Sequence, residues 1–204
     1  GFPDPPPPTA MTTLPPLAAL SDVSQTTRAL DTLFEPSAIL QKTLAPALAT
    51  RSQPWASYED LIDASLAELS SWDDALRAQF IAGHPRIGET QNLSHLSAKE
   101  QAARATPPEV LARLAHLNMC YERRYPSLRY ITFVNGRSRA EVAHEMEDAL
   151  GIPHSLDPHS PPLEEIIPIT AGDPIWRSEL DRAVSDIGHI ATSRLTSLRV
   201  MEER

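Results

Sequence analysis

Apolar residues recur at helical spacing along most of this 204-residue chain, and only one short stretch has the character of a β-strand. That stretch is residues 129–134, with the sequence Arg-Tyr-Ile-Thr-Phe-Val. A single strand cannot form a sheet, so we expect an extended segment that packs against helices. The pattern therefore predicts an all-α fold, a single-domain helical bundle.

Capping residues and prolines divide the periodic part of the chain into helices. Helices are expected to start at Ser21-Asp22, Pro36-Ser37, Ser57, Trp72-Asp73, Ser97, Pro107-Pro108, Ser138 and about Trp176. Gly83 and Pro85 end the helix that begins at Trp72-Asp73. Residues 85–96 are a predicted loop, and the proline-rich residues 151–174 are predicted to be an inserted loop.

Residues 1–20 form a proline-rich tail before the first predicted helix. The first ten of them precede Met11, and we interpret them as a remnant of an expression vector that carries no site. Residues 21–204 are then expected to form one helical domain.

The net charge of −9 argues against a nucleic acid or an anionic membrane as partner, because both require a basic surface. A small anionic substrate remains compatible with this charge. The single cysteine, Cys120, excludes an intrachain disulfide and fits a reducing compartment. We see no apolar run long enough to span a membrane and no signal peptide, and the last residues, Met201–Arg204, are not a peroxisomal tripeptide.

His84 is a candidate for proton transfer. Pro85 disfavours a helical conformation at His84, so its imidazole can be held to one side of the helix end. A histidine fixed in this way can donate or accept a proton near neutral pH. The alternative is a histidine that stabilises the C-terminal end of the helix dipole.

Ser97, Glu100 and Gln101 are candidates for substrate binding. They share one face of a predicted helix start, where free backbone N–H groups attract anions. Ser97 and Glu100 also match a Ser-x-x-Glu capping box, which serves only to begin a helix. Spacing does not decide between the two interpretations.

Asn118 and Tyr121 share a face of an otherwise apolar helix. Buried polar groups need partners, so we expect both to hold a neighbouring loop rather than a substrate.

The seven histidines do not predict a metal site. Zinc needs three or four converging ligands, and the chain has no His-Glu-x-x-His motif. His154 and His159 lie in the proline-rich loop without neighbouring ligands, and His144 lacks a second histidine at helical spacing. No glycine-rich fingerprint indicates a nucleotide cofactor either.

Taken together, these residues resemble those of the 2-oxo-4-hydroxy-4-carboxy-5-ureidoimidazoline (OHCU) decarboxylase family over about residues 28–200. The resemblance rests on Leu33-Phe34-Glu35, Gly83-His84-Pro85, Leu96-Ser97 with Glu100-Gln101, Leu117-Asn118 with Tyr121, and Ile187-Gly188-His189-Ile190. It implies an all-α fold, usually a homodimer, that uses no cofactor and no metal. The implied reaction is the last step from urate to (S)-allantoin, in the cytoplasm or the peroxisome.

The resemblance also implies roles for individual residues. His84 matches the catalytic histidine and Pro85 its substrate-contacting neighbour, while Glu100 is expected to act in catalysis beside Ser97 and Gln101 in the binding cluster. The extended segment that lines the substrate matches Tyr130, Ile131, Thr132, Phe133 and Val134.

The chain departs from the family pattern at three places. Arg86 stands where members resembling the animal enzyme have Asp, Tyr125-Pro126-Ser127 replaces Phe-Gly-Phe, and the loop at 151–174 is longer. Two alternatives to the decarboxylase therefore stay open. One is a helical protein that binds a ligand or partner without turnover, and the other is a lyase or hydrolase that acts on a different small substrate.

Overall fold

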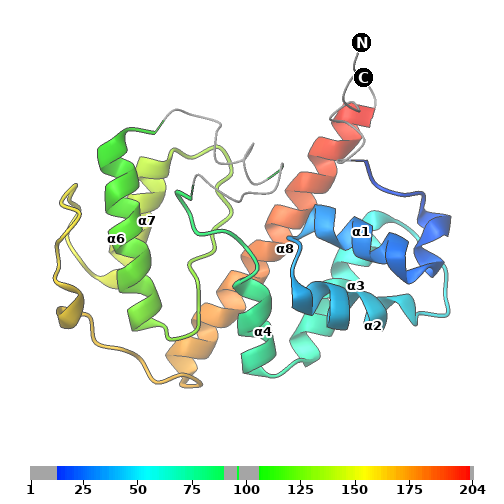
Figure 1. Ribbon diagram of the computed structural model, residues 1–204, viewed down its shortest axis with the longest axis horizontal. Helices are drawn as coiled ribbons and strands as arrows, with labels where there is room; N and C mark the ends of the chain where they lie inside the picture. The colour runs from blue at the N-terminus through cyan, green and yellow to red at the C-terminus, as the bar shows by residue number, and fades with distance from the viewer. Residues whose placement is uncertain (1–12, 90–95, 97–105, 203–204) are drawn as a thin grey trace, which may run out of the picture. The chain divides into compact units, whose positions relative to one another are not determined.

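The computed structural model of the protein describes residues 13–89, 96 and 106–202, with side chains through residue 199 (Figure 1). Within these ranges every regular element is helical and there is no strand, so the predicted all-α fold is confirmed. The chain forms two compact units. One consists of the residues up to Leu69 and those from Ile190 onward, and the other consists of Ser70–His189.

The first unit contains helices that start where the sequence predicts, after Asp22 and Ser57, and it also contains a 3-10 turn within the predicted tail. Its elements are the 3-10 turn η2 (Leu17–Ser21), α1 (Val23–Leu33), the π-helical turn η3 (Leu40–Leu44), α2 (Ala45–Ala49), α3 (Tyr58–Ser71) and the end of α8 (Pro174–Glu202). Asp22 caps α1, because its carboxylate accepts a hydrogen bond of 3.0 Å from the Ser24 N–H. Leu30, Leu33 and Leu61 are fully buried in the core of this unit.

A buried ion pair fixes the chain just after α1. Arg194 Nη2 lies 2.6 Å from Glu35 Oε1, and the same guanidinium donates to the carbonyl oxygen of Phe34. Arg194 and Glu35 are both almost completely buried. The Phe34-Glu35 pair is thus held by the last helix of the chain within the first unit.

The second unit contains the candidate site residues that the structure describes. Its elements are α4 (Asp74–Ile81), α6 (Pro108–Arg124), α7 (Arg139–Leu150), the 3-10 turn η4 (Leu163–Glu165) and the first part of α8. Helices α6 and α7 pack side by side (Figure 1).

Helix boundaries in this unit follow local signals. Asp73 caps α4 by accepting a hydrogen bond of 2.9 Å from the Leu76 N–H. Ser138 caps α7 in a reciprocal box with Glu141. The left-handed conformation of Gly151, with φ of 69°, ends the same helix. The predicted short helix after Ser97 lies outside the described residues.

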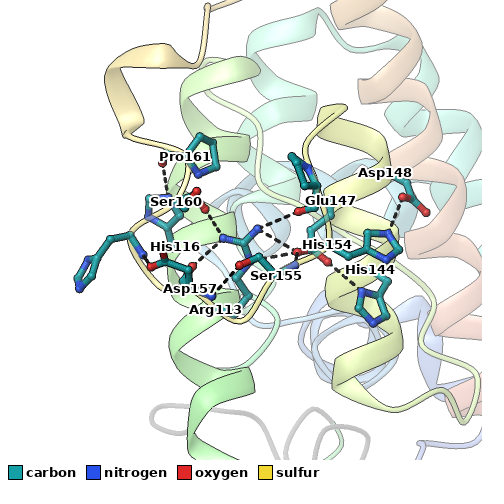
Figure 2. A network of polar contacts seen from close by, with 12 residues as sticks. Arg113, His116, His144, Glu147, Asp148, His154, Ser155, Asp157, Ser160 and Pro161 are labelled. Atoms are coloured by element: carbon teal, nitrogen blue, oxygen red, sulfur yellow. Dashed lines mark hydrogen bonds and ion pairs between the residues drawn. The ribbon is translucent and has the colours of Figure 1, made fainter.

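The proline-rich stretch is a loop, as the sequence predicts, and α8 begins at its end with Pro174. A single buried side chain holds much of this loop to α6 (Figure 2). Arg113 donates to the carbonyl oxygens of Asp157 at 2.8 Å, Pro153 at 3.3 Å and Ser160. His116, one turn further along α6, pairs with the Pro161 carbonyl at 2.7 Å.

Arg113 also forms a buried ion pair with Glu147 of α7. Its Nη2 and Nε atoms lie 2.9 and 3.1 Å from Glu147 Oε2, and both side chains are almost inaccessible to solvent. Burial by itself raises the pKa of the Glu147 carboxyl. Hydrogen bonds from His144, the Ser155 N–H and Arg113 outweigh it, so this pKa lies below its ordinary value. Glu147 is therefore a buried carboxylate that remains ionised.

Among the described residues, none of the helices combines the length and the apolar character that crossing a membrane requires.

Candidate functional site

His84 lies where α4 turns into the following loop, as the sequence predicts. The Ala82 N–H closes the end of α4 by donating to the Ala78 carbonyl, and the His84 N–H donates to the Ile81 carbonyl at 3.0 Å. The imidazole is not a surface cap, because only 4% of the residue is exposed. Its ring centroid lies 6.1 Å from that of Phe80. His84 is therefore held within the unit, as a positioned proton-transfer group must be.

Arg129 connects the His84 loop to the extended segment. Its Nη1 atom donates to the Ala82 carbonyl at 2.8 Å and to the His84 carbonyl at 2.6 Å. Burial lowers the pKa of this guanidinium, with a smaller contribution from the nearby Arg86. An arginine pKa starts so high that Arg129 still carries its charge at neutral pH. The sequence assigns His84 and Tyr130 to one site. Arg129, the neighbour of Tyr130, joins the two by its hydrogen bond to the His84 carbonyl.

The predicted extended segment forms neither a helix nor a strand, and side chains bind some of its backbone polar groups. Tyr130 and Ile131 are buried, whereas Thr132, Phe133 and Val134 are half-buried. The Phe133 N–H donates to Asp186 Oδ2 at 3.2 Å. Of the backbone donors predicted to face a substrate, this one is already used within the protein.

Glu145 of α7 is the centre of a polar network around the extended segment. It accepts hydrogen bonds from the Tyr130 hydroxyl and from Thr132 Oγ1, the latter at 2.9 Å, and it pairs with Arg137. Burial raises the pKa of the Glu145 carboxyl, but the hydrogen bonds from Tyr130, Arg137 and Thr132 prevail and the pKa is lowered. Burial and the neighbouring carboxylate raise the pKa of the Tyr130 hydroxyl.

Arg137 closes the turn that follows the extended segment. Its guanidinium donates to the carbonyl oxygens of Phe133 at 2.8 Å and Val134 at 3.0 Å. Asn135 and Gly136 provide the turn itself, with positive φ angles of 49° and 79°. Arg137 is therefore built into the scaffold of the segment rather than solvated.

A second charged network comes from α8. Arg182 pairs with Glu179 at 2.6 Å and with Asp186 at 3.1 Å, and its guanidinium carbon lies 5.3 Å from the centre of the Tyr130 ring. The Tyr121 hydroxyl donates to Glu179. Burial lowers the pKa of Arg182, but the hydrogen bonds to Glu179 outweigh it and the pKa is raised. Tyr121 thus has a structural partner, but this partner lies on α8 and not in a loop as the sequence predicts.

The loop after His84 borders a cavity of about 580 Å³ against α6. Arg86 forms a two-point ion pair with Glu122, with N–O distances of 2.7 and 2.9 Å. Asn118 donates to the Ile87 carbonyl at 3.0 Å, which confirms that it holds a neighbouring loop. The cavity is lined by Arg86, Ile87, Gly88, Glu89, Leu111, Ala115, Asn118, Met119, Glu122 and Leu163.

Sequence reasoning missed Glu145, Arg182 and Asp186, whose contacts with Tyr130 or Phe133 join parts of the chain that are separated in sequence. Only their positions on predicted helices, next to apolar faces, could have indicated them.

Of the other predicted site residues, Pro85 is half-buried beside His84. Ser97, Glu100 and Gln101 lie outside the described residues, so their place relative to His84 stays a prediction.

A comparison with models of protein families assigns the chain to a family. The family model described as OHCU decarboxylase matches residues 19–156, a range that contains His84, the extended segment and all of α7. No curated protein matches the chain in sequence.

Proposed function

Because the chain belongs to the OHCU decarboxylase family, we propose that it converts 2-oxo-4-hydroxy-4-carboxy-5-ureidoimidazoline to (S)-allantoin in urate degradation. The observation that supports this most directly is the buried His84, whose loop is fixed by Arg129 from the extended segment. The proposed enzyme is a carboxy-lyase that needs neither a cofactor nor a metal. We expect it to act as a homodimer, in the cytoplasm or the peroxisome.

The chemistry requires only positioning and proton transfer. The bond between the ring carbon and its carboxylate breaks, CO₂ leaves, and the electron pair stays on the ring carbon, where the adjacent unsaturated system delocalises it. The pair passes through the neighbouring carbon to the ring nitrogen, which takes up a proton. A second proton then adds to the neighbouring carbon that carries the ureido group, while the hydroxyl loses its proton and becomes the ring carbonyl. Because this second proton adds from one face, one enantiomer of allantoin is selected. His84 is proposed to deliver this proton or to polarise the substrate hydroxyl, tasks suited to an imidazole near neutral pH.

The other residues are proposed to orient the substrate. Glu100 would hold the hydroxyl or ureido groups, with Ser97 and Gln101 as hydrogen-bonding partners and Pro85 in contact beside His84. Backbone groups of residues 130–134 would bind the ring carbonyls. The Phe133 N–H already donates a hydrogen bond to Asp186. The contacts with the ring carbonyls are therefore assigned to the other residues of the segment. Such positioning turns a bound substrate into a reactive conformer.

The direct test is a coupled assay that starts from urate and generates the unstable substrate in place. We expect the purified protein to accelerate allantoin formation and to give optically active (S)-allantoin, measured by circular dichroism. Formation of racemic allantoin at the spontaneous rate would reject the proposal. Thermal stabilisation by substrate analogues without turnover would instead favour a binding protein on the same fold.

Glu100→Gln separates capping from catalysis at this residue. If Glu100 only completes a capping box, glutamine replaces it with a cost of about a few tenths of a kcal/mol and activity is kept. We expect instead that turnover falls by about a hundredfold or more, because the charged acceptor is lost. Steady-state kinetics at matched folded concentration measure the difference. Near wild-type kinetics would assign Glu100 to the scaffold.

Arg129→Met tests whether the His84 loop must be held in place. Its two hydrogen bonds to the Ala82 and His84 carbonyls are lost, which should destabilise the protein by about 1–3 kcal/mol. We expect kcat to fall by about ten- to a hundredfold with a smaller change in KM, because His84 is misplaced relative to the substrate. Arg129→Lys, which keeps a donor, should recover part of the rate.

The opposite outcome for Arg129→Met would assign this residue to folding alone. If kcat per folded molecule is unchanged while stability falls, Arg129 serves folding alone. Arg177→Met is the matched control, since Arg177 is mostly exposed and forms a surface pair with Asp74, so its loss should change neither quantity appreciably.

A further inference from the structure

Helix α7 and the loop after it bring together three potential metal ligands that are separated in sequence. His144 and Glu147 lie on α7, and His154 lies in the loop (Figure 2). One ligand atom from each of the three side chains lies within 4.8 Å of the other two. The two imidazole rings stack with centroids 4.2 Å apart. None of these residues belongs to the site proposed for catalysis.

The spacing of these atoms is close to that of a metal site. Zinc bonds of 2.0–2.2 Å at tetrahedral angles place neighbouring ligand atoms about 3.4 Å apart. His144 Nδ1 and Glu147 Oε1 are already 2.9 Å apart. The two histidine side chains are 52% and 49% exposed, so small rotations about their side-chain bonds can close the remaining gap without disturbing the core.

The Glu147 carboxylate is held in the orientation that a ligand needs. Its Oε2 atom accepts hydrogen bonds from Arg113 and, at 2.8 Å, from the Ser155 N–H. Its Oε1 atom faces His144. The side chain is fully buried, yet one oxygen is directed toward the exposed pair of histidines. Partners of this kind fix the orientation of carboxylate ligands in known metal sites.

His154 has the partner that metal-bound histidines generally have. Its Nε2 atom lies 2.7 Å from Asp148 Oδ1, so this nitrogen can donate its proton to a carboxylate. Nδ1 of the same ring is then left with its lone pair for a metal. A carboxylate that binds the second ring nitrogen fixes the tautomer and makes the imidazole a better ligand.

We propose that His144, Glu147 and His154 bind one divalent transition-metal ion of the zinc class, with water completing its coordination. Two imidazole nitrogens and one carboxylate oxygen suit Zn²⁺, Ni²⁺ or Cu²⁺, whereas Mg²⁺ and Ca²⁺ prefer oxygen ligands alone. Since two ligands come from α7 and one from the loop, the bound ion fastens the loop to the helix. Its role is structural, and it is independent of the proposed decarboxylation.

The test uses the full chain without an affinity tag, treated with a chelator and then freed of it. Isothermal titration with ZnCl₂ should give one ion per chain. His144→Ala and His154→Ala should each weaken binding by more than about a hundredfold, beyond the range expected for loss of an outer partner. His159→Ala is the matched control, because this exposed histidine lies in the same loop but outside the cluster, and it should bind zinc like the wild type.

A second measurement follows the thermal stability of the protein instead of the heat of zinc binding. Zinc at about a hundred times its dissociation constant should raise the Tm of the wild type and of His159→Ala by about 5–10 °C, and leave the Tm of the two cluster variants unchanged. Equal weakening in all three variants would show binding to surface histidines in general and overturn the proposal. Absence of saturable binding by the wild type, or zinc binding that survives both cluster substitutions, would overturn it as well.

Discussion

Replacement of His84 by alanine is expected to lower kcat for enantioselective decarboxylation by about 10²–10⁴-fold, the usual contribution of a positioned acid or base. The reason is structural as well as chemical. The imidazole is buried at the end of α4, and its own backbone carbonyl is held by Arg129, so the loop that carries it is fixed in place. The helical circular dichroism signal should be retained, with a loss of stability of less than about 3 kcal/mol. Kinetics on the freshly generated substrate measure the effect.

A second variant keeps this result interpretable. His84→Asn fills more of the space that alanine leaves empty and should be equally inactive, which separates lost chemistry from a packing defect. His159→Ala, at an exposed position, should retain full activity. A His84 variant with wild-type turnover would remove this residue from the mechanism. If both His84 variants unfold, the role of His84 is to stabilise the end of α4.

Replacement of Arg113 by methionine is expected to destabilise the protein by about 3–5 kcal/mol, the largest effect on stability that we predict. Methionine matches the length of the arginine stem but leaves the buried carboxylate of Glu147 without its cationic partner. The loop carbonyls of Asp157 and Ser160 lose their donor at the same time. Denaturation with urea measures the loss.

Two comparisons test this explanation of the Arg113 effect. The double variant Arg113→Met, Glu147→Leu removes the stranded charge and should regain part of the stability. In the wild type, the lowered pKa of Glu147 stabilises the fold above the ordinary carboxyl value of 4.5, and this contribution is lost as the pH falls through the folded-state pKa. In Arg113→Met the carboxyl is protonated more readily, so the difference from the wild type should shrink in acid. A difference independent of pH would contradict the buried-charge explanation.

Local signals in the sequence predicted the fold well because most helix boundaries depend on neighbouring residues. Asp22, Asp73 and Ser138 cap the helices that the sequence assigned to them, and Pro108 and Pro174 stand at two further starts. The π-helical turn η3 was not predicted, since its apolar residues repeat much as they do in an α-helix. Helix boundaries are local properties, whereas a shift in hydrogen bonding within a helix leaves little trace in the sequence.

The candidate site was predicted less completely because its partners are brought together by tertiary structure. His84 and the extended segment could be recognised from proline and from strand-like residues. The bonds from Arg129 to His84 and from Tyr130 to Glu145 join residues 45 and 15 positions apart. Likewise, helical spacing predicts no second histidine near His144, because His154 reaches it from the loop after α7 and not from the next turns of that helix.

The extended segment has a consequence for the behaviour of the protein in concentrated solution. Residues 129–134 have the composition of a strand, and a strand whose polar groups are not satisfied can pair with the same segment of another molecule and begin aggregation. Here Arg137 covers the carbonyls of Phe133 and Val134, and Asp186 binds the Phe133 N–H. These side chains occupy three of the backbone groups through which intermolecular pairing would start, so we expect them to protect the solubility of the protein at a segment that belongs to no sheet.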